Sequence, residues 1–141
     1  MKHRHAVACG GGTNHRIGLY DQVMIKDNHL AALEGNMAEA IQRARENYPD
    51  LKIEAEADTI EQAQAAAEAG ADIILLDNMS CDELRQAVGL IEGRAKTEAS
   101  GGVTLETVRE IAETGVDYIS VGALTHSAPS VDIALDFDQL S

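Results

Sequence analysis

Several residue types that mark extracellular, membrane-bound or nucleic-acid-binding proteins are scarce in this 141-residue sequence. Cysteine occurs only at Cys9 and Cys81, without CxxC spacing, which is typical of a reduced, cytoplasmic protein. Purely apolar runs do not exceed four residues, as at 73–76, so no membrane span is predicted. Basic residues number 11 against 24 acidic ones, and the net charge of −13 repels nucleic-acid phosphates and anionic membranes.

Aromatic side chains are also few, with three Tyr, one Phe and no Trp, so the core must be built from Ala, Ile, Leu and Val. The composition is 45% apolar and 25% charged, which is typical of a folded globular chain. The length suits one domain over residues 1–141. Residues 1–29 are net basic, whereas the remainder is strongly acidic. This asymmetry indicates either a local anion site or a solvated basic tail.

Strands and helices are predicted to alternate along the chain, from the spacing of apolar residues. The predicted strands cover residues 22–26, 52–57, 73–76, 95–99 and 117–121. The predicted helices cover 36–48, 59–69, a segment that begins with a capping box at 80–83, and 104–114. The strands recur mostly at about 21 to 23 residues, which is the length of a βα unit.

We predict an α/β fold, a partial β/α barrel of about five βα units, because polar residues cluster at the carboxyl ends of successive predicted strands. These residues are Lys26, Glu56, Asp77, Glu98, and Ser120 with Gly122. An open doubly wound sheet is the alternative. A complete eight-unit barrel needs roughly 250 residues, so five units do not close. Residues 131–137 alternate with period two, which predicts a further strand; its apolar face and the open sheet edges predict self-association.

Charged residues within two predicted strands are expected to point into the barrel. Glu54 and Glu56 share one face of their strand, and Lys96 and Glu98 share a face of another. Buried charges must be paired or bound to a ligand. One interpretation is a structural ion-pair network in which Glu54 pairs with Lys96. The other is ligand contact by Glu56, Asp77 and Glu98.

Three glycine-containing segments are candidates for binding anions. Ser100-Gly101-Gly102 precedes a predicted helix, where backbone N–H groups and the helix dipole favour a phosphate. The loop at 122–127 follows the last predicted strand, and loops after the last two strands commonly bind phosphate in barrels. The glycines at 10–12 lead to Arg16, whose guanidinium suits a carboxylate or phosphate. Ordinary turns and a flexible linker are the alternatives.

Six sequence blocks occur in a defined order. They are Cys9-Gly10-Gly11-Gly12-x-Asn14-His15-Arg16, Ile25-Lys26-Asp27-Asn28-His29, Glu54-x-Glu56, Leu76-Asp77-Asn78, Glu98-x-Ser100-Gly101-Gly102 and Val121-Gly122-Ala123-Leu124-Thr125-His126-Ser127. Together they resemble the quinolinate phosphoribosyltransferase family, also called carboxylating nicotinate-nucleotide pyrophosphorylase. The similarity runs from about residue 6 to residue 137, and the ordered set is highly specific whereas a single block is not.

The resemblance implies an incomplete, TIM-like α/β barrel that follows an N-terminal α/β sandwich, usually in an intertwined dimer. It also implies a reaction: quinolinate and 5-phosphoribosyl 1-pyrophosphate, with Mg²⁺ as cofactor, give nicotinate mononucleotide, pyrophosphate and CO₂ in NAD biosynthesis. The family's dimers agree with the homo-oligomer that the open sheet edges predict, and the cysteine content predicts a cytoplasmic setting.

The same resemblance implies roles for particular residues. His15, Arg16 and Lys26 would contact the quinolinate carboxylates. Glu56 and Asp77 would face the ribose and the Mg²⁺-pyrophosphate, with no direct protein ligand assigned to the metal. Lys26, Glu56 and Asp77 are the expected catalytic residues. The remaining substrate-binding residues, which would hold the phosphoribosyl group and its 5-phosphate, are Ser100, Gly101, Gly102, Gly122 and His126.

The family's sandwich domain and an earlier strand that ends in Asp-Thr-Arg-Lys-Thr do not occur in these 141 residues. We therefore expect turnover by these residues alone to be at least about 10²-fold below that of a full-length relative. Two other hypotheses remain. One is a catalytically impaired half-barrel that self-assembles or binds phosphate metabolites. The other is a different phosphosugar enzyme such as an aldolase, with Lys26 as a Schiff-base lysine.

Overall fold

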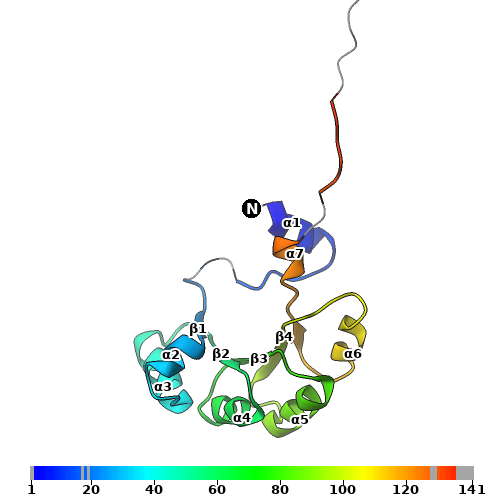
Figure 1. Ribbon diagram of the computed structural model, residues 1–141. Coiled ribbons are helices and arrows are strands. Elements are labelled where there is room, and N and C mark those ends of the chain that lie inside the picture. Colours follow the sequence, from blue (N-terminus) through cyan, green and yellow to red (C-terminus); the bar gives the residue numbers. More distant parts are fainter. Residues whose placement is uncertain (1, 17, 19, 128–129, 136–141) are drawn as a thin grey trace, which may run out of the picture.

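Five strands in the described part of the chain form one parallel sheet that curves around a concave face (Figure 1). The computed structural model describes residues 2–16, 18, 20–127 and 130–135. The strands are β1 (Val23–Ile25), β2 (Ile53–Ala57), β3 (Ile73–Asp77), β4 (Lys96–Ser100) and β5 (Tyr118–Ile119). They lie in chain order and each pairs in parallel with the next. The fold is therefore the partial β/α barrel that the sequence predicts.

Helices line the convex side of this sheet, and two further helices lie above its concave side (Figure 1). Along the convex side run α3 (Met37–Asn47), α4 (Ile60–Glu68), α5 (Cys81–Ile91) and α6 (Val108–Ala112), with the short α2 (Asp27–Ala31) at the β1 end. In contrast, α1 (Lys2–Cys9) and α7 (Ala123–His126) contact each other above the concave face. The segment before β1 and the segment after β5 thus meet above the concave face of the sheet.

Local hydrogen bonds explain where two of the helices begin. Asn36 Oδ1 accepts from the backbone N–H of Glu39 at 3.0 Å and so caps α3. At the start of α5, the Ser80 backbone N–H donates to Glu83 Oε2 at 2.8 Å, while Ser80 Oγ accepts from Glu83 N at 3.4 Å. The capping box predicted at 80–83 is confirmed.

The core lies between the sheet and the convex-side helices, and it is aliphatic, as the scarcity of aromatic residues predicts. Alanine is frequent in it, and small side chains allow helices to approach a sheet closely. The side chains that are fully buried there come from β2, β3, α4 and α5: Ile53, Ala55, Ala57, Ile74, Leu76, Ala63, Ala66 and Ala87. The concave face is therefore formed by the other side chains of the same strands, which are polar on β2 and β4, whereas β3 places Ile73 and Leu75 there.

Two predicted segments differ in the structure. The helix predicted from residue 104 begins at Val108, because Thr104 and Thr107 bond to each other: the Thr104 N–H donates to Thr107 Oγ1 at 3.0 Å. Side-chain hydroxyls of this kind compete with helical hydrogen bonds. The strand predicted at 131–137 is wrong over its described part, since residues 130–135 are irregular and pair with no strand. Phe137 lies outside the described residues.

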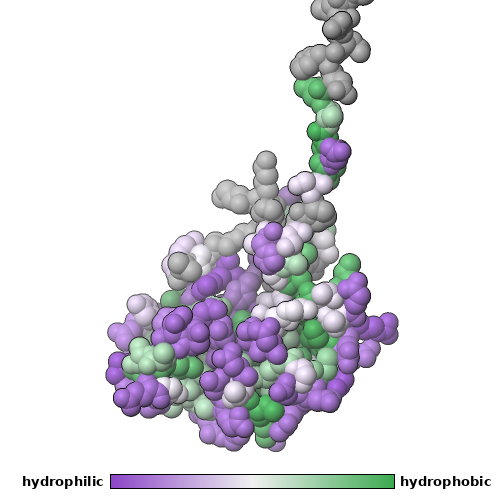
Figure 2. Space-filling model, viewed as in Figure 1, coloured by the Kyte–Doolittle hydropathy of each residue, from purple (hydrophilic) through white to green (hydrophobic). Residues whose placement is uncertain are grey.

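Three short helices, α1, α2 and α7, were not predicted from the sequence. The N-terminal segment has few apolar residues to set a helical period, and α2 is only five residues long. The surface is mostly hydrophilic over the outer helices, whereas the extended segment at 130–135 carries apolar side chains (Figure 2). Among the described residues, no helix combines the length and apolar character needed to cross a membrane.

Candidate functional site

Lys26 and Glu56 form an ion pair at the carboxyl edge of the sheet. Lys26 follows β1, Glu56 is near the end of β2, and the parallel register places these two strand ends side by side. The distance from Lys26 Nζ to Glu56 Oε2 is 2.5 Å. The hydrogen bond to Glu56 is the main cause that raises the pKa of Lys26. Partial burial lowers this pKa, the charges of Glu56 and Asp77 raise it further, and the net change is a rise. Lys26 is therefore a cation, whereas a Schiff-base lysine needs a lowered pKa.

Asp77 and Ser100 end the next two strands, where they are paired in the register of β3 and β4. Asp77 is half-buried, and its Oδ2 accepts from Nδ2 of Asn78 at 2.6 Å. Its carboxylate acts on the pKa of Lys26, so the two charged groups belong to one cluster. The edge thus presents one ammonium and two carboxylates in sequence from β1 to β3.

Two glycine loops continue the same edge beyond β4 and β5. Gly101 and Gly102 have φ of +90° and +59°, a region in which side chains are strained. Because α6 begins only at Val108, these residues do not cap a helix, and their backbone N–H groups remain the candidate phosphate donors. After β5, Gly122 leads into α7, and a Cβ there would lie 3.3 Å from Nε2 of the exposed His126.

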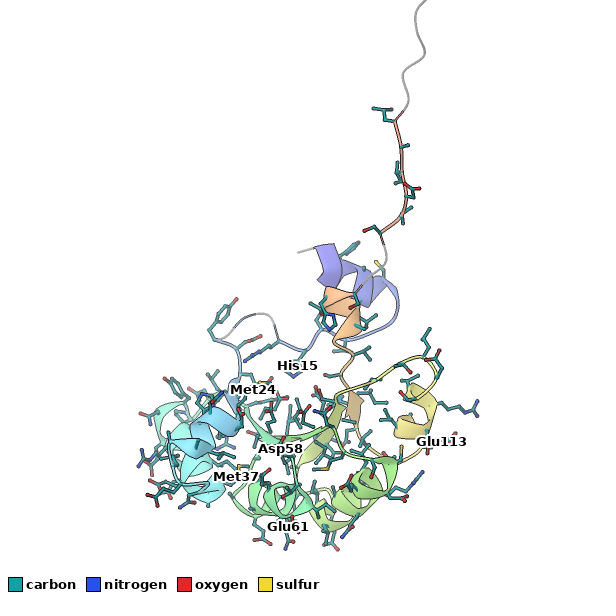
Figure 3. The ribbon with its side chains drawn as sticks, in the orientation of Figure 1. His15, Met24, Met37, Asp58, Glu61 and Glu113 are labelled. Carbon is teal, nitrogen blue, oxygen red and sulfur yellow. The ribbon has the colours of Figure 1, made fainter. Side chains whose placement is uncertain are left out.

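His15 projects onto the concave face of the sheet, between two carboxylates (Figure 3). Its Nε2 lies 3.1 Å from Glu54 Oε2 on β2 and 3.4 Å from Glu98 Oε1 on β4. Gln22 donates a further hydrogen bond to Glu54, and Ser120 donates one to Glu98. Both carboxylates are buried, so His15 anchors the segment at 10–16 across the hollow of the half-barrel.

The glycines before His15 are explained by the backbone that they form. Gly10 N and Gly12 N donate at 2.9 Å to carbonyls of α1, which ends in a tight turn. Gly11 has φ of +83°, and a Cβ at Gly12 would lie 2.9 Å from the Val7 side chain. The positive φ of Gly11 and the close approach of Val7 to Gly12 therefore account for two of the three glycines without an anion.

The predicted pairing of Glu54 with Lys96 is wrong. Lys96 begins β4, is largely exposed, and its Nζ lies 2.6 Å from Asp117 Oδ1. Glu54 instead bonds to His15 and Gln22. Strand alternation correctly predicts that Glu54 faces inward. Its partner His15 lies in a loop, and the path of that loop cannot be predicted from the sequence pattern. Glu54, Gln22 and Asn78 were not among the predicted site residues.

Among the described residues, side chains that could hold a metal ion occur in two places. His15, Glu54 and Glu98 bring one ligand atom each within 4.8 Å of one another, although His15 Nε2 already contacts both carboxylates. Glu56 and Asp77 offer carboxylate oxygens at the carboxyl edge, which are the donors that Mg²⁺ prefers.

Two hollows adjoin these residues. One, of about 560 Å³, wraps around β1 and is lined by Arg16, Lys26 and His29 together with Tyr20 and Tyr48. The other, of about 440 Å³, lies on the concave face. Its lining includes His15, Gln22, Glu98, Tyr118 and Ser120. The first is a cationic hollow and suits an anionic ligand, whereas the second has a mixed lining that also includes Ile73 and Ile119.

Comparisons with known proteins agree with each other. A family model described as quinolinate phosphoribosyl transferase, C-terminal domain, matches residues 1–136. The chain is 50% identical over 137 residues to the probable carboxylating nicotinate-nucleotide pyrophosphorylase of Bacillus subtilis, covering 96% of this chain and 47% of that protein. It is 46% identical over 136 residues to the carboxylating nicotinate-nucleotide pyrophosphorylase of Mycobacterium leprae, covering 94% and 48%. The chain thus spans about half the length of these relatives.

Solved structures show the same similarity. The crystal structure of NadC from Streptococcus pyogenes has a TM-score of 0.86 and 44% identity, covering 92% of this chain and 46% of that chain. Thiamine phosphate pyrophosphorylase from Pyrococcus furiosus, at 24% identity and a TM-score of 0.53, covers 70% of this chain and 55% of that chain and is similar in fold alone.

Proposed function

The chain belongs to the quinolinate phosphoribosyltransferase family, and from this premise we propose that it takes part in phosphoribosyl transfer from 5-phosphoribosyl 1-pyrophosphate to quinolinate. Decarboxylation of the product would give nicotinate mononucleotide, with pyrophosphate and CO₂ released, as a step of NAD biosynthesis. The reaction classifies the protein as a pentosyltransferase. The two cysteines, Cys9 and Cys81, are free thiols and suit the cytoplasmic setting that we propose with it.

One observation carries this proposal: the chemistry of the carboxyl edge changes in order from β1 to β5. Cationic side chains lie around β1, carboxylates end β2 and β3, and glycine loops follow β4 and β5. A dicarboxylate, a ribose that develops positive charge and a phosphate need these three environments in this order. Since the strands are neighbours, one substrate pair can contact all three.

At the cationic end, Arg16, Lys26 and His29 line one hollow. Arg16 and Lys26 are proposed to hold the quinolinate carboxylates, because charge-assisted hydrogen bonds are the strongest that side chains offer a carboxylate. His15 lies nearby on the concave face, with Nε2 directed to Glu54 and Glu98. Its proposed contact with quinolinate would therefore use Nδ1.

In the middle of the edge, Glu56 and Asp77 are proposed to face C1 of the ribose. Departure of pyrophosphate leaves cationic character at that carbon, and fixed carboxylates stabilise it. Lys26 keeps Glu56 in place through its ion pair and is itself held charged. Bound Mg²⁺ would neutralise charge on the departing pyrophosphate, and the oxygens of Glu56 and Asp77 suit that ion.

At the far end, the backbone of Ser100, Gly101 and Gly102 and that of Gly122 are proposed to hold the 5-phosphate. Backbone N–H groups in left-handed or turn conformations form concave anion sites. His126, one turn into α7 from Gly122, would lie beside the same phosphoribosyl substrate.

Calorimetric titration tests the proposal directly. Quinolinate, a pyridine-2,3-dicarboxylate, should bind more tightly than nicotinate, which has one carboxylate fewer. Turnover is followed separately as CO₂ released from labelled quinolinate in the presence of 5-phosphoribosyl 1-pyrophosphate and Mg²⁺. Equal binding of the two pyridine acids, without CO₂ release, would contradict the proposal.

A second candidate is a half-barrel that binds phosphate metabolites without turnover. The observation that favours it is that no described strand pairs with the outer edges of β1 and β5, because an unclosed barrel leaves the site exposed to water. Tight binding of phosphoribosyl compounds with no release of pyrophosphate would support this alternative.

A further inference from the structure

Asn78 has no role in the proposed function, yet it contacts two parts of the candidate site. It immediately follows β3, and its backbone N–H donates to the carbonyl of Ser100 at 2.9 Å. Its side-chain Nδ2 donates to Oδ2 of Asp77 at 2.6 Å. One residue therefore bonds both to the carboxylate that ends β3 and to the backbone from which the glycine loop begins.

The direction of the Asn78 side chain follows from these partners. An ionised carboxylate can only accept hydrogen bonds, so the NH₂ group must face Asp77 and the carbonyl Oδ1 must face away from it. That oxygen occupies the space beside Gly101: a Cβ added at Gly101 would lie 2.1 Å from Asn78 Oδ1 and 3.0 Å from Asn78 N. The missing side chain at Gly101 is what leaves room for the amide.

The backbone of Asn78 is also unusual. Its φ is +54°, and among the described residues only Glu34 and Glu92 share a positive φ without being glycine. Asparagine tolerates this region better than most side chains. A conformation that costs free energy persists only where the surrounding contacts hold it, and here the contacts are those with Asp77, Ser100 and Gly101.

We propose that Asn78 is a positioning residue, which fixes the Asp77 carboxylate and the Ser100-Gly101-Gly102 loop in one relative geometry. The ribose carbon and the 5-phosphate of one substrate would then meet both groups at once, and such positioning supplies much of the rate enhancement in group transfer. The identity of this substrate rests on the proposed function. The contact between Asn78 and Gly101 does not.

Steady-state kinetics separate the contact of Asn78 with Asp77 from its contact with Gly101. Asn78→Asp keeps the size and the tolerance of positive φ but replaces the donor with a carboxylate beside Asp77. We expect kcat to fall by at least about tenfold, with KM for 5-phosphoribosyl 1-pyrophosphate changed less than about threefold. Gly101→Ala displaces the loop and should chiefly raise that KM. Glu92→Gly, which relieves the same backbone conformation at the end of α5, is the control and should change neither constant.

Thermal unfolding tests the contact independently of turnover. Gly101→Ala should lower Tm by at least about 3 °C in the otherwise unchanged chain, and by clearly less in the Asn78→Gly background, where the amide is gone. Additive shifts would overturn the proposed contact, and unchanged kinetic constants in Asn78→Asp would overturn the positioning role. If the unchanged chain binds no phosphoribosyl pyrophosphate, the proposed function fails while the unfolding experiment still decides the contact.

Discussion

Glu54 is a fully buried carboxylate that shares the concave face with a second one, Glu98. Burial raises the pKa of Glu54, and Glu98 adds to the rise, whereas the charges of His15 and Arg16 oppose it. The folded-state pKa therefore lies above the unfolded value of 4.5. The ionised form costs the folded state free energy, and this cost develops as the pH rises from about 4.5 through the raised pKa.

Glu54→Gln should therefore have a higher Tm than the unchanged chain at pH 7, because the variant places no charge at this buried position. Loss of the contact between Glu54 and Nε2 of His15 makes this gain in Tm smaller. The advantage should shrink as the pH falls towards 4.5, because the carboxyl of Glu54 is then protonated in both states. Circular dichroism melts at several pH values measure this difference. Glu46→Gln, at an exposed position on α3 where the carboxylate accepts from the neutral Gln42 amide, is the matched control. A difference independent of pH would contradict the assignment.

Arg16 belongs to the proposed quinolinate subsite, in the hollow that it lines with Lys26. Arg16→Ala should weaken quinolinate binding by about 1.5–3 kcal/mol, the range of a hydrogen bond to a charged group. Calorimetric titration gives the dissociation constant. The control is Arg43→Ala, which removes an exposed arginine of α3. An unchanged constant in Arg16→Ala would exclude this residue from the site.

At the residue scale, strand alternation was enough to predict which side chains face inward. It placed Glu56 and Lys26 at strand ends, where the structure pairs them. It did not predict that His15 lies between Glu54 and Glu98, because that contact depends on the path of an irregular segment across the sheet. Positions at strand ends were predictable, whereas the partners were not: the predicted contact of Glu54 with Lys96 is wrong, and the pairing of Lys26 with Glu56 was not predicted.

At the scale of single elements, α5 depends on the hydrogen bonds of its first turn. Ser80 Oγ accepts from the Glu83 N–H, and the Ser80 backbone N–H donates to the Glu83 carboxylate. The hydrogen bonds to Ser80 lower the pKa of Glu83, so the cap acts with an ionised carboxylate at neutral pH.

Ser80→Ala should lower the free energy of unfolding by about 1 kcal/mol, the usual loss for an N-cap hydroxyl. Urea unfolding followed by circular dichroism measures the change. Ser130→Ala, which removes an exposed hydroxyl from the irregular segment at 130–135, should leave stability unchanged. Equal stability of Ser80→Ala and the unchanged chain would contradict the role of the cap.

Elements were predictable where a cap and an apolar period agree, as in α3 and α5. They were mispredicted where only one signal is present. Residues 131–135 alternate apolar and polar side chains, but nothing in the described chain pairs with them, so the alternation alone does not make a strand. In α6 the apolar period extends too far, since threonine side chains delay the start of the helix.

At the scale of the whole molecule, the half-barrel formed by the described residues has two open sheet edges, at β1 and β5. Unpaired strand edges favour association with another chain. Val131, Ile133 and Leu135 add exposed apolar side chains, each about four-fifths accessible (Figure 2). We expect the protein to self-associate.

Sedimentation velocity at micromolar concentration tests this expectation. The chain should sediment as a dimer or larger species, and Val131→Lys with Ile133→Lys should weaken association by placing charges on the exposed segment. Leu90→Lys, at an exposed apolar position on the convex side, is the control and should leave the assembly unchanged. A stable monomer of the unchanged chain would contradict the expectation.

The tyrosines have a spectroscopic consequence. Each of them lies outside the core, with exposures of 75% at Tyr20, 55% at Tyr48 and 48% at Tyr118. Tyr20 and Tyr48 line the cationic hollow around β1, and Tyr118 lines the hollow on the concave face. Because the sequence has no tryptophan, ultraviolet emission comes from these three rings. Intrinsic fluorescence of this protein should therefore change when a ligand enters either hollow and change little when the aliphatic core melts.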